Sequence, residues 1–67
     1  MNLTINGESQ ALPDTLSTVQ DLLEYLKIQD RIVVVEINRN ILQKEDHGNT
    51  PVSDRDTIEL VHFVGGG

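Results

Sequence analysis

The sequence predicts an α+β domain in which one helix packs across a mixed sheet, in the order β-β-α-β-β-β. Three observations predict this class: an alternating apolar segment followed by a tight-turn signal, one segment with helical apolar spacing, and two later segments rich in β-branched residues. The 67 residues suffice for a single domain. We expect residues 1–64 to form that domain and residues 65–67 to be a flexible C-terminal glycine tail.

The N-terminal segment has the pattern of a β-hairpin. Residues 1–6 alternate apolar and polar side chains, which is the period-2 signature of a half-buried strand. The dipeptide Asn6-Gly7 then favours a two-residue type I′ turn, because both central residues of that turn need positive φ. A second strand is therefore expected to run to about Ala11.

The next segment changes to helical spacing. Four apolar residues stand at i, i+3, i+4 and i+7, namely Val19, Leu22, Leu23 and Leu26. Thr18 or Ser17 can act as the N-cap, and Asp21 stands three residues after Thr18, as in a capping box. We expect a helix at about residues 18–27.

Two strands and a turn are expected after the helix. Residues 32–37 form a β-branched run, which favours a strand that the helix covers on one face, and we expect it to be the central strand of the sheet. Residues 38–40 supply turn chemistry, and Ile41 and Leu42 can begin a short return strand.

The last strand is expected at residues 57–64. It follows a polar, turn-rich stretch at residues 44–51 and a second turn at residues 54–56. Ile58 and Leu60 are expected to face the core. The residues expected on the other side of the strand are Glu59, Val61 and Phe63.

Composition excludes several functional classes. The chain has no cysteine, which rules out disulfides, thiolate zinc sites, iron–sulfur clusters and a thiol nucleophile. Its net charge of -6 disfavours nucleic acid and anionic membrane surfaces as partners. No apolar run approaches the roughly 20 residues of a membrane span, and the first strand begins at the first residue, so we expect a cytoplasmic protein. So small a domain leaves little interior for a closed active site, and we expect no catalytic activity of its own.

The two histidines do not indicate a metal site. Neither His47 nor His62 has a second histidine or a carboxylate at a spacing typical of metal ligands. We interpret His47 as a solvated loop residue and His62 as a packing residue near the end of the last strand.

The glycine tail is the least ordinary feature of the sequence. Gly65, Gly66 and Gly67 could be a linker fragment or an engineered tail. Alternatively, an extended triglycine is the thinnest peptide available, and it could reach about 10 Å beyond the domain into a partner's narrow channel. The Gly67 α-carboxylate would then be the reactive group. It could attack the α-phosphate of ATP and form an acyl-adenylate that is open to a sulfur nucleophile.

The outward face of the last strand is a candidate docking patch. Val61 and Phe63 are apolar residues just before the tail, and Glu59 lies on the same face. Another part of the fold could cover this face, or the two residues could be singly exposed apolar residues of the usual kind. As a patch, they would orient the tail toward a partner's active site, and the acidic balance would favour a basic partner.

The C-terminal run of residues 54–67 resembles the signature of the ThiS family, the sulfur carriers of thiamine biosynthesis. Residues 33–39 resemble that family's third strand and the turn after it. The resemblance covers essentially the whole chain and implies a ubiquitin-like β-grasp fold. Gly66 and Gly67 match the family's diglycine, while the residue at the position of Gly65 varies between members. Val61 and Phe63 match the partner-facing edge by position.

The resemblance also implies a reaction cycle. A ThiF-like adenylyltransferase would activate Gly67 with ATP, and a sulfur donor such as a cysteine desulfurase would convert it to a thiocarboxylate. A ThiG-like thiazole synthase would then draw the sulfur into the thiazole ring. The carrier itself would hold no cofactor.

Three alternatives remain open on sequence alone. The same pattern suits MoaD, a relative that feeds molybdopterin synthesis, although MoaD-like chains are usually longer and have a bulkier approach to the diglycine. The chain could also be a ubiquitin-like protein conjugator or an interaction module with an inert tail.

Overall fold

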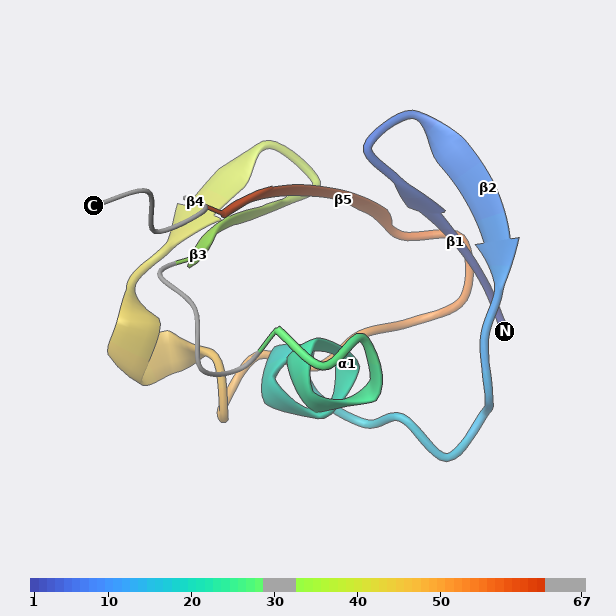
Figure 1. Cartoon of the computed structure of the whole chain (residues 1–67), viewed down its shortest axis with the longest axis horizontal. Coiled ribbons are helices and arrows are strands. Elements are labelled where there is room, and N and C mark those ends of the chain that lie inside the picture. The colour runs from blue at the N-terminus through green and yellow to red at the C-terminus, as the bar shows by residue number, and fades with distance from the viewer. Residues whose placement is uncertain (29–32, 63–67) are drawn as a thin grey trace.

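The structure is a computed structural model that describes residues 1–28 and 33–62. Its elements in chain order are β1 (Asn2–Ile5), β2 (Glu8–Ala11), α1 (Val19–Tyr25), β3 (Val33–Ile37), β4 (Asn40–Leu42), the 3-10 helix η1 (Lys44–Asp46) and β5 (Thr57–His62). Figure 1 shows α1 packed against one face of the five-stranded sheet. The expected β-β-α-β-β-β order is confirmed. Within the described ranges, no helix is long and apolar enough to span a membrane.

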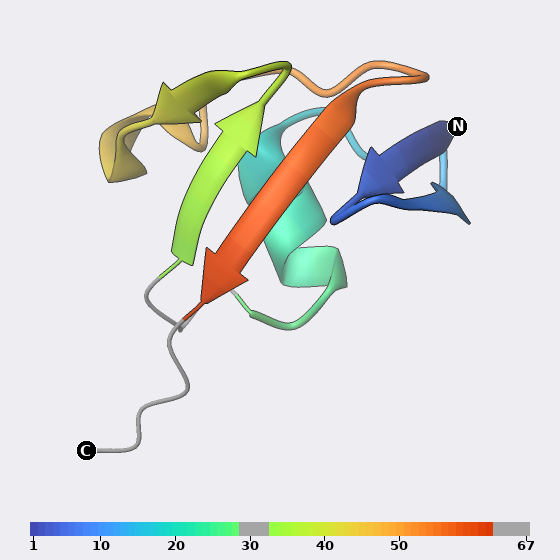
Figure 2. The same ribbon diagram turned by 90° about the horizontal axis from the view of Figure 1, so that it is seen from above.

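The sheet has the strand order β2-β1-β5-β3-β4, so β5 is its central strand. β5 pairs in parallel with β1, where Ile58 lies opposite Ile5, and antiparallel with β3, where Ile58 lies opposite Ile37. Figure 2 shows β5 crossing over α1, with β3 and β4 on one side and β1 and β2 on the other. The segment that leads to the glycine tail is therefore held between two neighbouring strands.

The prediction that residues 32–37 form the central strand is wrong, since β3 lies between β5 and β4. The expectation of one covered face is confirmed, because Val35 is fully buried whereas Val34 is 40% exposed. β-branched residues suit any pleated, half-buried surface. The composition of a strand therefore does not reveal its position within a sheet.

The β1–β2 hairpin has the expected tight turn. Asn6 and Gly7 both have positive φ, 51° and 84°, and Ile5 lies opposite Glu8 across the two-residue loop. This backbone geometry matches the right-handed twist of the flanking strands. The β3–β4 turn repeats the pattern, since Asn38 and Arg39 have φ of 47° and 72°.

α1 begins at the expected cap. The Asp21 N–H donates to Thr18 Oγ1 and the Thr18 N–H donates to Asp21 Oδ2, both at 3.2 Å, which completes a capping box. The C-cap is Leu26, and Lys27 then adopts a φ of 63° that no helix can continue. The helix is thus slightly shorter than the expected residues 18–27.

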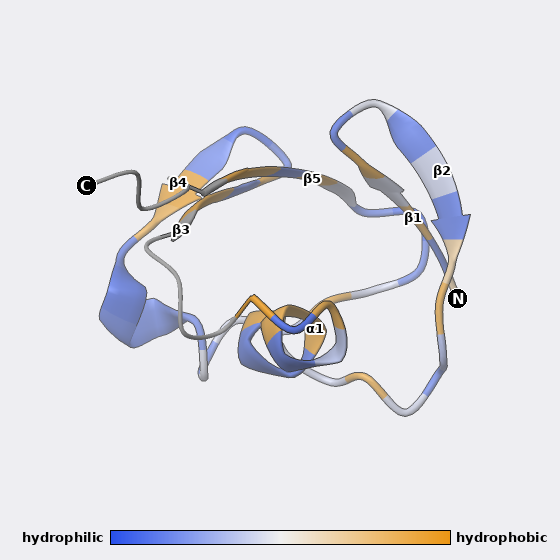
Figure 3. Cartoon of the chain, viewed as in Figure 1, coloured by the Kyte–Doolittle hydropathy of each residue, from blue (hydrophilic) through white to orange (hydrophobic). Residues whose placement is uncertain are grey.

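The core lies between α1 and the sheet. Figure 3 shows apolar segments of β1, β3 and β5 lining the sheet above an apolar side of α1. The most deeply buried side chains are Leu3, Val19, Leu22, Val35 and Ile58. Their positions confirm the helical stripe and the alternation that the sequence predicts for the first and last strands.

The prediction that His47 is a solvated loop residue is also wrong, because its side chain is buried, with only 5% exposure. The loop around it packs on the first turn of α1. The Gln20 N–H donates to the His47 carbonyl and the Val19 N–H donates to the Thr50 carbonyl, both at 2.9 Å. Since the first N–H groups of a helix have no partner within the helix, the loop supplies acceptors for them. This docking places His47 in the interior.

Candidate functional site

The predicted site residues fall into two groups. Phe63 and the tail, Gly65, Gly66 and Gly67, lie outside the residues that the structure describes, as does the expected boundary at residue 64. Glu59 and Val61 lie on β5. The described part of the site is therefore the strand that leads into the tail.

β5 has two different faces. Ile58 and Leu60 are buried against α1, at 0% and 7% exposure, while Glu59 is exposed and Val61 is 53% exposed. This is the alternation that the sequence predicts. Val61 is therefore an exposed apolar residue on the face of the sheet opposite α1.

Residues of β3 extend this exposed surface. Val34 lies directly opposite Val61, and Glu36 lies directly opposite Glu59. We call these four residues the open-face patch. Sequence reasoning missed Val34 and Glu36, because their place beside β5 depends on which strands pair and in what register. Once β3 is placed antiparallel to β5, the alternation of both strands would identify them.

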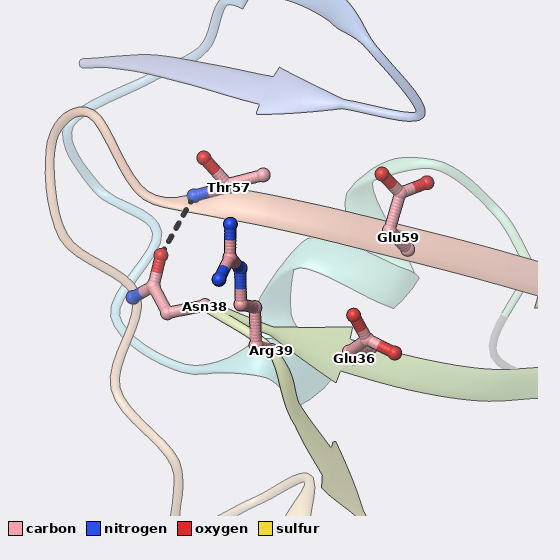
Figure 4. A pocket seen from close by; sticks show the side chains of 5 residues that line it. All are labelled: Glu36, Asn38, Arg39, Thr57 and Glu59. Atoms are coloured by element: carbon pink, nitrogen blue, oxygen red, sulfur yellow. Dashed lines mark hydrogen bonds between the residues drawn. The ribbon is translucent and has the colours of Figure 1, made fainter.

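The two glutamates of the open-face patch oppose each other directly across the two strands. Figure 4 shows both carboxylates on one side of the sheet, and the Arg39 guanidinium extending toward Thr57. In residues 1–28 and 33–62, ion pairs join the N-terminal amine to Asp14 and Arg55 to Asp54, and neither glutamate takes part. Like charges directly opposite each other destabilise a strand pair. The open-face patch is thus acidic and partly apolar, and its two carboxylates have no ion-pair partner among the described residues.

A shallow depression adjoins the patch. Its lining residues are Glu36, Asn38, Arg39, Thr57 and Glu59, and Figure 4 shows their side chains. The Asn38 amide is occupied in structural contacts, since its Oδ1 accepts from the Thr57 N–H at 3.0 Å and its Nδ2 donates to Asp56 at 3.1 Å. The described residues contain no group of three potential metal ligands. The arrangement supports recognition of a cationic, partly apolar surface.

Farther along β5, the Asn6 side chain holds Leu60, two residues before the end of the strand. Its Oδ1 accepts from the Leu60 N–H at 2.7 Å, and its Nδ2 donates to the Leu60 carbonyl at 3.2 Å. The sequence identified Asn6 and Asn38 only as turn residues. Their contacts with β5 join residues far apart in the chain, and local sequence carries no signal for them.

Comparison with known proteins shows the family to which the chain belongs. The family model described as "ThiS family" matches residues 2–67. The sulfur carrier protein ThiS of Bacillus subtilis is 43% identical over 65 residues, which is 97% of this chain and 98% of that protein. The thiazole synthase of Paramagnetospirillum magneticum is 40% identical over 67 residues, which is the whole of this chain and 20% of that protein.

A solved structure confirms the fold. The crystal structure of the thiamine biosynthesis protein ThiS from Geobacter metallireducens has a TM-score of 0.82 and 40% sequence identity, with both chains covered completely. The mixed sheet with one helix is thus the ubiquitin-like β-grasp fold. These similarities favour the ThiS assignment over the MoaD alternative and over an inert interaction module. The chain belongs to the ThiS family, the sulfur carrier proteins of thiamine biosynthesis.

Proposed function

We propose that Gly67 is the residue that carries sulfur. An oxygen of its α-carboxylate attacks the α-phosphate of ATP on a ThiF-like adenylyltransferase, and pyrophosphate leaves. A sulfur nucleophile then attacks the acyl carbon and displaces AMP. Hydrosulfide gives the thiocarboxylate directly, whereas the persulfide of a donor such as a cysteine desulfurase first gives an acyl disulfide, which a thiol reduces to the thiocarboxylate and a disulfide. The resulting thiocarboxylate gives its sulfur to thiazole formation. The chain acts as a carrier in the cytoplasm, holds no cofactor and leaves catalysis to its partners.

The observation that carries this proposal is the extent of the family match. The similarity to ThiS runs through residue 67 and so includes the triglycine. Glycine has no Cβ, so Gly65 and Gly66 can pass through a channel that would exclude other residues. The absence of cysteine adds support, because no side-chain thiol of the carrier can compete for the activated carboxyl group.

A ThiG-like thiazole synthase is the acceptor in this proposal. The chain is similar over its full length to one fifth of the thiazole synthase of Paramagnetospirillum magneticum, and similarly to that of Magnetococcus marinus. A carrier-like segment within the synthase polypeptide keeps the two together at high effective concentration. The fusion supports the proposal that carrier and synthase also bind each other for sulfur transfer when they are separate chains.

The open-face patch, together with Phe63, is the docking surface in this proposal. Val34 and Val61 offer apolar contact, and Glu36 and Glu59 offer two carboxylates to a basic side chain of the partner. The net charge of -6 adds long-range attraction to a basic surface and raises the association rate. Docking beside the end of β5 would direct the tail toward the partner's active site.

Intact mass spectrometry tests the proposal. The carrier ending at Gly67 is incubated with the adenylyltransferase of the same organism, ATP and a sulfide source. We expect a mass gain that equals the replacement of one oxygen atom by sulfur. The matched control carries one additional residue after Gly67, which moves the carboxylate off the diglycine, and it should gain nothing. If the mass of the native carrier stays unchanged although the adenylyltransferase is active, the sulfur-carrying role is refuted.

A further inference from the structure

Asn6 makes three hydrogen bonds to β5 from the β1–β2 turn. Its backbone N–H donates to the Ile58 carbonyl at 2.9 Å. Its side-chain amide then accepts from the Leu60 N–H and donates to the Leu60 carbonyl, as described above. One residue near the start of the chain therefore holds the last strand at two positions, Ile58 and Leu60.

The Asn6 side chain bonds to the β5 backbone at a point that β1 does not reach. β1 pairs with β5 only at Thr4–Thr57 and Ile5–Ile58, because the chain then turns away into β2. Backbone groups alternate sides along a strand, so the N–H and carbonyl of Leu60 point to the same side as those of Ile58, toward β1. In the described pairing, no residue of β1 lies opposite Leu60. The Asn6 amide presents one acceptor and one donor there, as a peptide group would.

This contact lies where β5 leads toward the proposed site. β5 ends at His62, and Gly67 stands seven positions after Leu60 in the sequence. On the β3 side the pairing continues to the end of the strand, where Val33 lies opposite His62. On the β1 side, the Asn6 amide is the last described contact that holds the β5 backbone. Its loss would free one side of the strand near the point where the tail begins.

We propose that Asn6 is a positioning residue for delivery of the tail, and this inference rests on the proposed role of Gly67. Attack of the Gly67 carboxylate on the α-phosphate of ATP requires the reacting atoms in near-attack geometry, and a displacement of about 1 Å can slow a reaction by about a hundredfold. A β5 strand that is held on both sides as far as Leu60 limits the directions in which the tail leaves the domain. Asn6 thus acts through β5 on where the Gly67 carboxylate arrives, without touching the reacting atoms.

Asn38 provides an internal control. It occupies the same place in the β3–β4 turn, has a similar positive φ of 47°, and its side chain makes two hydrogen bonds, to Thr57 and Asp56. It holds Thr57 at the beginning of β5, whereas the Asn6 side chain holds Leu60, two residues before the end. Asn6→Gly and Asn38→Gly each delete two side-chain hydrogen bonds and keep a residue that tolerates positive φ. The two variants should lose similar amounts of stability.

The experiment compares the two variants in amide hydrogen exchange and in adenylation kinetics, with the adenylyltransferase of the same organism and pyrophosphate release as the readout. In Asn6→Gly we expect the Leu60 amide to exchange about tenfold faster, since it loses its acceptor. We expect kcat to fall about tenfold with KM unchanged, because the variant still docks on the enzyme but places its tail less precisely in the active site. Asn38→Gly should keep kcat within about twofold of wild type. If Asn6→Gly does not fold, Asn6→Asp takes its place. It replaces the donor to the Leu60 carbonyl by a carboxylate oxygen and keeps an acceptor for the Leu60 N–H, so the fall in kcat is then the deciding readout.

Equal losses of kcat in the Asn6 and Asn38 variants would show a general effect of stability and overturn the inference. A wild-type kcat in Asn6→Gly, despite faster Leu60 exchange, would overturn it as well. If the wild-type carrier itself is not adenylated, the proposed function fails and the role of Asn6 fails with it. If wild type is adenylated but kcat of Asn6→Gly does not fall below that of Asn38→Gly, the positioning role of Asn6 is refuted and the proposed function stands.

Discussion

Replacing Glu36 by Gln removes one of two carboxylates that face each other across β3 and β5. Glu36 lies directly opposite Glu59, and neither has an ion-pair partner among residues 1–28 and 33–62. Directly opposed like charges cost a strand pair about 0.2–1 kcal/mol. The variant keeps the shape of the side chain and removes this repulsion. We therefore expect Glu36→Gln to be more stable than wild type.

The expected size can be stated as a melting temperature. In a domain of this size, 1 kcal/mol corresponds to about 4–8 °C, so Glu36→Gln should melt roughly 1–8 °C higher. Thermal unfolding by circular dichroism at low salt measures the shift. In 1 M salt the Debye length falls to about 3 Å, and the difference between variant and wild type should shrink.

Glu8→Gln is the matched control. Glu8 is exposed on β2 and lies opposite the apolar Ile5, so this variant makes the same change in net charge without relieving a cross-strand pair. Any stabilisation common to both variants reflects the net charge of -6. The excess in Glu36→Gln is the contribution of the opposed pair.

The same substitution should weaken partner binding. If the open-face patch docks a basic side chain, loss of one carboxylate should raise the Kd for the adenylyltransferase about threefold to tenfold at low salt. Stability and affinity would then change in opposite directions in one variant. Glu36→Gln with unchanged or lower melting temperature relative to Glu8→Gln would refute the repulsion argument, and an unchanged Kd would remove Glu36 from the docking surface.

Three further predictions test the tail, the docking surface and the helix cap. Deleting Gly67 should abolish sulfur loading in the mass assay and leave the melting temperature nearly unchanged, since terminal glycines make few packing contacts; a large loss of stability would place the tail within the fold. Phe63→Ala should weaken binding to the adenylyltransferase by about 1 kcal/mol or more in calorimetry, as expected for an aromatic anchor, and equal affinity in a folded variant would contradict this. Thr18→Ala removes the acceptor for the Asp21 N–H and should cost about 1 kcal/mol in urea unfolding; unchanged stability would show that the capping box is not needed.

Local sequence signals predicted the elements of the fold well. The Asn6-Gly7 turn and the Thr18–Asp21 capping box are determined by residues close to each other in the chain, and the structure contains both. The two faces of β5 followed from alternation alone, which correctly placed Glu59 and Val61 outward. Period-2 alternation in a strand is therefore sufficient to identify the candidate docking residues on β5.

Long-range contacts account for what the sequence could not show. The central position belongs to β5 because β1 and β3 pair with its two edges, and no local pattern specifies that order. His47 is buried because its loop docks on α1 and supplies acceptors to Gln20 and its neighbour. Val34 and Glu36 join the open-face patch only through the register between β3 and β5.

The location of the sulfur atom tests the central claim most directly. After incubation with adenylyltransferase, ATP and a sulfide source, the intact carrier is fragmented in the mass spectrometer. The account predicts that the added mass appears in the C-terminal fragment that contains only Gly67, and in no fragment that lacks this residue. Added mass on any fragment that ends before Gly67 would contradict it.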